Sequence, residues 1–219
     1  MKEKKTLKDI IHNKIINEII MGNFAQNAII TEKQLVEMFA VSKSPVREAL
    51  IELCNEGVLI SMPRYGYQIV QLDIKSIMDA IEIRMLLEIS GLEKTFKRLD
   101  SGMINELKKN INEYDENETS VDVWMYWNNN TSFHLLLNSF SENTLMNNML
   151  KKTLGILSRA YAQYYWNNWK ETASSLDIDV HRSIVHSLEN KDFDNAILKL
   201  KEDINSMGNQ FINRQNVSF

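Results

Sequence analysis

Two cations and a hydroxyl lie at the start of one predicted helix within the run VSKSPVREAL, namely Lys43, Ser44 and Arg47. The apolar residues of this helix recur at the spacing i, i+3, i+4 and i+7, so they share one packed face and leave the three polar residues outside it. The N-terminal end of such a helix can enter the major groove of duplex DNA, where an arginine can donate two hydrogen bonds to a guanine edge. Arg47 is therefore predicted to read a base, and Lys43 and Ser44 to contact DNA beside it.

The elements around this helix complete a helix-turn-helix. An upstream helix opens at Thr31, whose hydroxyl has the capping-box spacing to Gln34. A turn over residues 40–42 joins it to the second helix, in which Pro45 falls in the first turn, where a missing N–H costs nothing. Gly57 ends the second helix as a glycine after the C-cap does. This order of signals predicts a compact unit that reads DNA.

A short hairpin is predicted directly after the second helix. The β-rich runs 58–60 and 67–70 flank the turn PRYG, which brings Arg64 and Gly66 near the tip. Two helices, a turn and a hairpin in this order predict a winged helix-turn-helix over residues 1–72. The alternative is a purely structural subdomain in which the cations of the second helix are merely solvated.

Composition excludes several classes of protein. The chain has 219 residues, of which 44% are hydrophobic and 25% charged, as is ordinary for a globular protein with a sizeable core. No apolar run approaches the length of about 18 residues that a membrane span needs. A single cysteine, Cys54, cannot form an internal disulfide, which is typical of a reducing cytoplasm.

The charge balance limits how DNA could be bound. Net charge is −4; residues 1–72 hold 9 Lys and Arg against 8 Asp and Glu, and residues 73–219 hold 16 against 21. A broadly basic surface is therefore excluded. Affinity for DNA would have to come from locally clustered cations and from two copies acting together.

From residue 73 onward the helical period dominates. Both prolines lie in the N-terminal third, and short polar breaks separate the amphipathic segments. Six helices with short connections predict an all-α antiparallel bundle over residues 73–219, so the whole chain is predicted to be mainly α. The predicted helices cover residues 74–99, 102–117, 120–139, 142–168, 176–189 and 191–213.

The N-terminal residues also carry a family resemblance. The run TEKQLVEMFAVSKSPVREALIELCNEGVL resembles the DNA-binding signature of the GntR family of bacterial transcription regulators. The resemblance implies that Lys33, Lys43 and Arg47 contact DNA and that Gly66, at the wing tip, enters the minor groove. Because lysine lacks the planar fork of the arginine that the family more often has, the two lysines are expected to contact phosphates. The predicted DNA-binding residues are Lys33, Lys43, Ser44, Arg47, Arg64 and Gly66.

The helical part resembles the FCD ligand-binding domain that accompanies this module in the FadR-type branch of the family. The matching pieces are IRMLLE at 83–88, FH at 133–134, SEN at 141–143 and HRSIVHSL at 181–188. Metal-binding members hold Asp, His, His and His at four positions, which the resemblance places here on Asn130, His134, His181 and Asp203. Such a set implies a divalent metal, Zn²⁺, Ni²⁺ or Mn²⁺. The alternative is a metal-free pocket in which the same residues contact an organic effector.

Two further residues are predicted to contact an effector. Arg84 lies in an apolar run, where an unpaired cation would be costly. It either pairs with Glu88 or faces the bundle cavity and binds a carboxylate bidentately, as the resemblance implies. An aromatic segment on a later helix has spacing typical of a core or a dimer interface. Either Tyr161 or Tyr165 could line the cavity, and Tyr161 is the predicted contact. The segment comprises Tyr161, Tyr164, Tyr165, Trp166 and Trp169.

These expectations favour a cytoplasmic, homodimeric transcription regulator, most simply a repressor. Two copies would place their recognition helices on the half-sites of a palindromic operator, and a small carboxylate effector would bias the DNA-binding state. A second hypothesis is a metal-dependent enzyme built on the same histidines and aspartate, although HExxH, G-x-S-x-G and a Gly-rich phosphate loop are all missing from the sequence. A third is an interaction protein that keeps the winged helix without affinity for DNA.

Overall fold

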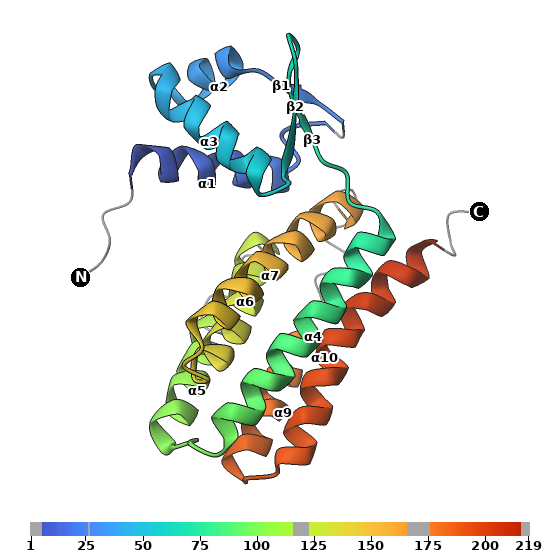
Figure 1. Cartoon of the computed structure of the whole chain (residues 1–219). Helices are drawn as coiled ribbons and strands as arrows, with labels where there is room; N and C mark the ends of the chain where they lie inside the picture. Colours follow the sequence, from blue (N-terminus) through green and yellow to red (C-terminus); the bar gives the residue numbers. More distant parts are fainter. Residues whose placement is uncertain (1–5, 26, 116–122, 166–175, 216–219) are drawn as a thin grey trace. The chain divides into compact units, whose positions relative to one another are not determined.

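The computed structural model describes residues 6–25, 27–115, 123–165 and 176–215 (Figure 1). The chain divides into two compact units. The first comprises Met1–Leu72 together with Tyr161–Trp166, and the second comprises Asp73–Ala160 together with Asn167–Phe219.

The N-terminal part of the first unit is a winged helix-turn-helix, as predicted. Its helices are α1 (Leu7–Ile20), α2 (Glu32–Phe39) and α3 (Lys43–Asn55). Its strands are β1 (Ile29–Ile30), β2 (Leu59–Met62) and β3 (Gly66–Ile69). The middle strand, β3, pairs antiparallel with both β1 and β2.

Local sequence sets the ends of these helices. Thr6 caps α1 in a full capping box, and the Thr31 hydroxyl accepts a hydrogen bond from the backbone N–H of Gln34 at the start of α2. Ala40 adopts a left-handed conformation, with φ of 52°, that ends α2. Ser42 is the N-cap residue of α3 by position but makes no side-chain capping hydrogen bond.

One apolar core holds the helices and the sheet together. The inward face of α3 is apolar, so the opposite face of this helix is left to solvent. Removing this surface from water is worth about 25 cal/mol per Å². The buried residues of the core are Ile11, Ile15, Phe24, Ile30, Leu35, Val46, Ala49, Leu50, Leu53, Val58, Leu59 and Ile69.

Gly66 sets how closely the hairpin approaches β1. Its φ is +134°, and a Cβ at this position would lie 2.5 Å from the carbonyl oxygen of Ile30. A glycine is therefore required where β3 passes β1. Residues 63–65 form the turn before it, in which Arg64 has a positive φ of 73°, and Gly66 is the first residue of β3.

The second unit is a bundle of helices. Its helices are α4 (Ile74–Phe96), α5 (Ser101–Asp115), α6 (Val123–Ser139), α7 (Thr144–Tyr165), α9 (Leu176–Glu189) and α10 (Phe193–Gln215). α10 packs against α4 and α9, α5 packs against α6 and α9, and α4 packs against α6. Figure 1 shows α4 (green) and α10 (red) running side by side. No helix in the described part of the chain is both long and apolar enough to cross a membrane.

The predicted bundle is confirmed, and its helix ends follow the caps. The side-chain oxygens of Asn143 and Asp192 accept hydrogen bonds from backbone N–H groups three residues ahead. These caps start α7 at Thr144 and α10 at Phe193, whereas the sequence predicts starts at 142 and 191. The break predicted between the helices at 142–168 and 176–189 lies outside the described residues.

Candidate functional site

Glu32 on α2 ties together the two cations predicted to bind DNA at the start of α3. Lys43 Nζ lies 3.1 Å from one carboxylate oxygen of Glu32, and Nε of Arg47 donates to the other at 2.9 Å. The bond uses only Nε, whereas a guanine edge accepts from the terminal amino groups of a guanidinium. The side chains of Lys43 and Arg47 remain 65% and 57% exposed, so DNA can reach both.

These ion pairs fix the charge of Glu32. The hydrogen bond from Arg47 lowers the pKa of Glu32, partial burial opposes this shift, and Lys43 adds to it. The carboxylate in turn raises the pKa of Arg47. The sequence analysis did not single out Glu32. One signal was available: an anion directly before the predicted contact Lys33 is unexpected in a module that binds a polyanion.

The other predicted DNA contacts are all on the surface. Ser44 is exposed, and its hydroxyl donates to Glu48 at 2.8 Å on the same helix. Lys33 is exposed on α2 and lies 3.8 Å from Glu37 one turn later. Arg64 is exposed in the turn of the hairpin. The structure thus gathers Ser44 with the two Glu32-bound cations and leaves Lys33 and Arg64 on other elements; DNA contact by each remains a prediction.

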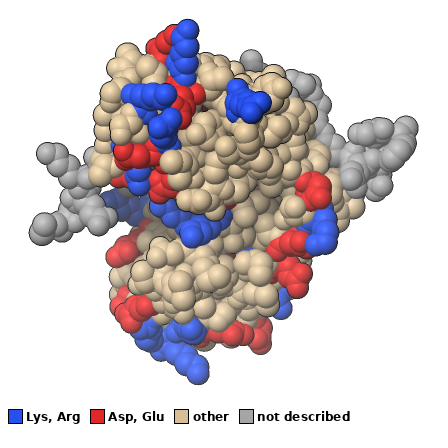
Figure 2. Space-filling model, turned by 45° about the horizontal axis from the view of Figure 1, so that its top comes forward, with Lys and Arg blue, Asp and Glu red and all other residues tan. Residues whose placement is uncertain are grey.

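Charged side chains of both signs are interspersed on the face drawn in Figure 2, with broad uncharged areas between them. This view contains no continuous basic surface, as the nearly equal numbers of cations and anions in residues 1–72 predict. The cations at the start of α3 therefore form a small cluster and are not part of a broad basic surface.

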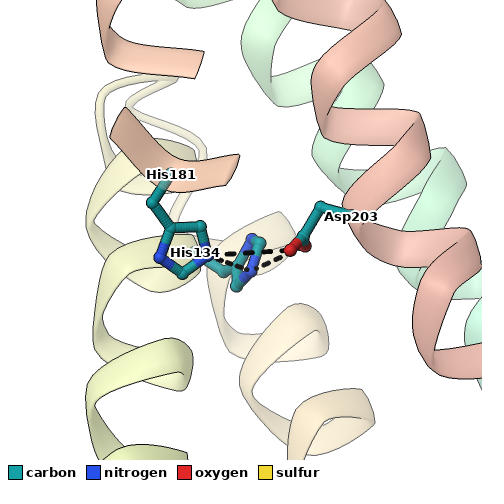
Figure 3. Close-up of side chains that lie close together, drawn as sticks. All are labelled: His134, His181 and Asp203. Carbon is teal, nitrogen blue, oxygen red and sulfur yellow. Dashed lines mark hydrogen bonds and ion pairs between the residues drawn. The ribbon is translucent and has the colours of Figure 1, made fainter. Parts of the chain in front are cut away.

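A second group of polar side chains lies in the core of the helical unit. His134 from α6, His181 from α9 and Asp203 from α10 present ligand atoms that all lie within 4.8 Å of one another (Figure 3). The two histidine Nε2 atoms are 3.3 Å apart, and His134 Nε2 is 3.1 Å from the Asp203 carboxylate. All three residues are buried. The Phe133 ring stacks on His181 with centroids 3.9 Å apart, which restricts the orientation of that imidazole.

Arg84 from α4 joins this group and is only 1% exposed. Its Nε donates to Glu88 at 2.5 Å, and its Nη2 donates to Asp203 at 3.1 Å and lies 2.7 Å from His134 Nε2. Of the two alternatives drawn from the sequence, the structure contains the pairing with Glu88, with Asp203 as a second partner. A cation paired in this way avoids much of the cost of burial. Together these five residues, Arg84, Glu88, His134, His181 and Asp203, form the buried polar cluster.

Protonation states follow from the geometry of the buried polar cluster. Glu88 Oε2 lies 2.6 Å from Nδ1 of His134, so Nδ1 carries the proton and Nε2 presents a lone pair. Arg84 can only donate, so its 2.7 Å approach to Nε2 is a hydrogen bond when that nitrogen carries no proton. Burial and Arg84 lower the pKa of His134, and Glu88 and Asp203 raise it by more. Burial, with a contribution from His134, lowers the pKa of His181 to about 3, so this imidazole is neutral. Burial raises the pKa of Glu88, but Arg84 and His134 lower it by more, and Glu88 is an anion.

The donor atoms suit a divalent transition metal. Two neutral imidazoles and a carboxylate are ligands that Zn²⁺, Ni²⁺ and Mn²⁺ accept. A carboxylate on the far nitrogen of a ligating histidine, as Glu88 is on His134, is the usual outer support of such a site. Asn130 is buried one turn before His134 on α6, and its part as a fourth ligand remains a prediction.

The aromatic segment is only partly described. Tyr161 is half-buried on α7, and the segment Tyr161–Trp166 is grouped with residues 1–72. Its contact with an effector remains a prediction. Trp166 and Trp169 lie outside the described residues.

Comparison with known relatives points to one family of proteins. At 30% identity over 141 residues, the HTH-type transcriptional regulator YdhC of Bacillus subtilis aligns with 64% of this chain and 63% of its own length. The gluconate operon transcriptional repressor of B. subtilis is 26% identical over 157 residues, 72% of this chain and 58% of that protein. These alignments thus span about six tenths of each relative.

Solved structures share the fold. E. coli McbR/YncC superposes with a TM-score of 0.82 at 19% identity, over 98% of this chain and 100% of that one. A GntR regulator from Rhodococcus sp. RHA1 superposes with a TM-score of 0.72 at 15% identity, over 94% and 97%. At these identities the likeness concerns the fold alone.

Family models match both units of the chain. The model of the bacterial regulatory proteins of the gntR family matches residues 7–69, and that of the FCD domain matches residues 79–206. These are families of regulators and not of enzymes, which decides against the metal-dependent enzyme. Regulators of this kind bind operator DNA through the winged helix and carry the FCD domain for effector binding. The chain therefore belongs to the GntR family of transcription regulators, with an FCD domain as its helical part.

Proposed function

We propose that the protein is a cytoplasmic repressor that binds a palindromic operator as a homodimer. The observation that supports this most directly is the exposed pair of Lys43 and Arg47 at the start of α3. One copy offers few cations, so a second copy is needed for a useful number of phosphate contacts. The names of two relatives, the gluconate operon repressors of B. subtilis and B. licheniformis, support repression as the direction of control.

Within this proposal the DNA-binding residues have different tasks. Arg47 reads a guanine through its terminal amino groups, and Lys33, Lys43, Ser44 and Arg64 contact the backbone. Gly66 is assigned to the minor groove from the family resemblance, and it supports this contact by letting the hairpin pack against β1, where a Cβ would meet the Ile30 carbonyl.

We further propose that the buried polar cluster is the effector site. A divalent metal, Zn²⁺, Ni²⁺ or Mn²⁺, is held by His134, His181 and Asp203, with Asn130 as a fourth ligand. The ion supplies Lewis acidity and attraction for a small carboxylate. Arg84 is assigned to the same effector. Gluconate, which the names of two relatives contain, is a small carboxylate and fits this class.

Control of DNA binding follows from the helices that carry the buried polar cluster. Arg84 and Glu88 lie on α4, which begins at Ile74, two residues after the last residue of the DNA-binding segment. A ligand that shifts α4 is therefore coupled through the chain to the winged helix. The coupling is allosteric if the ligand binds the DNA-competent and incompetent states with different affinity.

Thermal unfolding of the metal-stripped chain tests the effector site. Divalent metals are added singly, and then a panel of small carboxylic acids. A ligand that binds only the folded state raises the unfolding temperature by mass action. The rise is expected for a transition metal and is expected to be lost in His181→Ala but kept in His186→Ala, an exposed histidine on the same helix. A rise with an acid that needs Arg84 and no metal would replace the metal site by a metal-free pocket.

A further inference from the structure

The guanidinium of Arg84 contacts two of the side chains that would bind a metal. Its Nη2 lies 2.7 Å from Nε2 of His134 and 3.1 Å from Oδ2 of Asp203. Both atoms belong to the set of three whose mutual distances suit one metal ion. The contact is made in the core, since Arg84, His134 and Asp203 are all buried.

Arg84 and a metal ion would compete for one lone pair, that of Nε2 in His134. A neutral imidazole has a single acceptor nitrogen, and Glu88 at 2.6 Å from Nδ1 leaves Nε2 as that acceptor in His134. Nη2 of Arg84 lies 2.7 Å from this atom, so Nε2 accepts the hydrogen bond with this lone pair when the imidazole is neutral, and the guanidinium blocks access to the atom in any case. A metal at the usual distance of about 2.0–2.1 Å from Nε2 would use the same lone pair. The two cations therefore exclude each other at this atom.

We propose that Arg84 is a built-in competitor for the divalent metal, so that the metal binds only when the guanidinium leaves His134 and Asp203. This inference rests on the proposed metal site and adds the exchange of cations to it. Arg84 keeps a partner after the exchange, because its Nε donates separately to Glu88 at 2.5 Å. Its terminal amino groups then become the donors for a carboxylate ligand.

The net charge of the buried polar cluster predicts the order in which metal and anion bind. With neutral imidazoles, Arg84, Glu88 and Asp203 give the buried polar cluster a net charge of about −1, and a divalent ion makes it about +1. The cluster therefore repels an anion before the exchange and attracts one after it. A small monocarboxylate should bind only to the metal-loaded protein, and each ligand should tighten the binding of the other.

Zn²⁺ titration of the full chain by isothermal calorimetry tests the exchange. Arg84→Met removes the competing cation while keeping an unbranched side chain of moderate length. Each charge-assisted hydrogen bond that the ion no longer has to displace is worth roughly tenfold or more, so Zn²⁺ should bind about 10- to 100-fold tighter to R84M than to the natural chain. The matched control is Arg98→Met. This guanidinium pairs with Glu142 and donates to the Phe140 carbonyl outside the buried polar cluster, and its loss should leave Zn²⁺ affinity unchanged.

Loss of Arg84 leaves Glu88 and Asp203 without their cation, so R84M is also expected to unfold at lower temperature until Zn²⁺ is added. If R84M does not fold, Arg84→Met combined with Glu88→Gln removes one charge of each sign and is titrated instead. Zn²⁺ binding that is equally tight with and without Arg84 would overturn the exchange while leaving the metal site in place. Failure of every variant to bind Zn²⁺, Ni²⁺ or Mn²⁺ would instead remove the metal site itself, and the exchange with it.

Acetate serves as the probe for the anion. In the natural chain it should raise the unfolding temperature only when Zn²⁺ is present, and this rise should be absent in R84M. A response to acetate without any metal would contradict the predicted order of binding.

Discussion

The carboxylate of Glu32 lies 2.9 Å from Nε of Arg47, a residue 15 positions later in the chain and on the following helix. Arg47 is more than half exposed, and an ion pair in such a setting contributes little to stability. Its effect on orientation is larger, because a guanidinium held at Nε has fewer directions in which its terminal amino groups can point. Glu32 is thus placed to position Arg47, the residue proposed to read a base.

Replacing Arg47 by lysine should separate base reading from charge. R47K keeps the cation but loses the bidentate fork, so discrimination against a wrong base pair should fall by about 1–3 kcal/mol while affinity for random DNA changes little. Fluorescence anisotropy with operator and scrambled duplexes measures both quantities. Lys75→Ala, which removes an exposed cation of α4 that pairs with Asp79, is the control. Unchanged discrimination in R47K would show that Arg47 does not read a base.

Neutralising Glu32 should shift affinity and specificity in opposite directions. Glu32→Gln removes the anion from both Lys43 and Arg47, so binding to random DNA should strengthen, whereas discrimination between operator and random DNA should weaken as Arg47 loses its anchor. The control is Glu56→Gln, whose carboxylate contacts His12 at 2.8 Å and neither of the two cations. The ratio of the two dissociation constants, measured at several salt concentrations, is the decisive quantity. A rise in both affinities by the same factor would mean that Glu32 acts only as a charge.

The sequence predicts the architecture well because its signals are local. Capping at Thr31, the apolar face of α3 and the glycine of the hairpin each act within a few residues. The buried polar cluster depends on partners far apart in the chain, since Arg84 meets Asp203 across 119 positions. Only a family resemblance brought His134, His181 and Asp203 together in advance. The contact between Arg84 and His134 could not be predicted, because either pairing or exposure to a cavity satisfies a buried arginine equally well in the sequence.

A pair of glycines offers a test of backbone constraint. Gly66→Ala places a methyl group 2.5 Å from the Ile30 carbonyl at a φ of +134°, and should destabilise the winged helix by about 1–3 kcal/mol or more. Gly155→Ala lies within α7 with nothing within 4 Å of its new Cβ, and should stabilise the chain by up to about 1 kcal/mol. Urea denaturation followed by circular dichroism compares the two. Equal effects of the two substitutions would contradict the assigned role of Gly66.

Removing one partner from the buried polar cluster should be costly. Glu88→Gln weakens the bonds to Arg84 and to His134 Nδ1 together, and leaves a buried cation undercompensated, so the free energy of unfolding should fall by about 3–5 kcal/mol. Glu142→Gln, which breaks the exposed pair with Arg98, should cost less than about 1 kcal/mol. Chemical denaturation of both variants makes the comparison. If E88Q were as stable as E142Q, the contacts of Glu88 with Arg84 on the same helix and with His134 on α6 would not stabilise the bundle.

The stability of the first unit should depend on the ionisation of Asp9 at acid pH. Hydrogen bonds from Thr6 lower the pKa of Asp9 to about 2, below the ordinary value of 3.8. A carboxyl group whose pKa is lowered by folding stabilises the fold above its unfolded pKa and loses this effect as pH falls toward the folded pKa. Asp9→Asn should therefore be less stable than the natural chain at neutral pH, and the difference should vanish between pH 3.8 and about 2. Unfolding temperatures of the two proteins across this range give the result; a difference that persists at the acid end would exclude the capping box as its source.

The buried polar cluster draws its five side chains from α4, α6, α9 and α10, and no two of these helices supply the whole set. The proposed effector site is consequently complete only when all four helices have packed together. We expect a fragment that lacks α10 to lose Asp203, and with it one of the three proposed metal ligands.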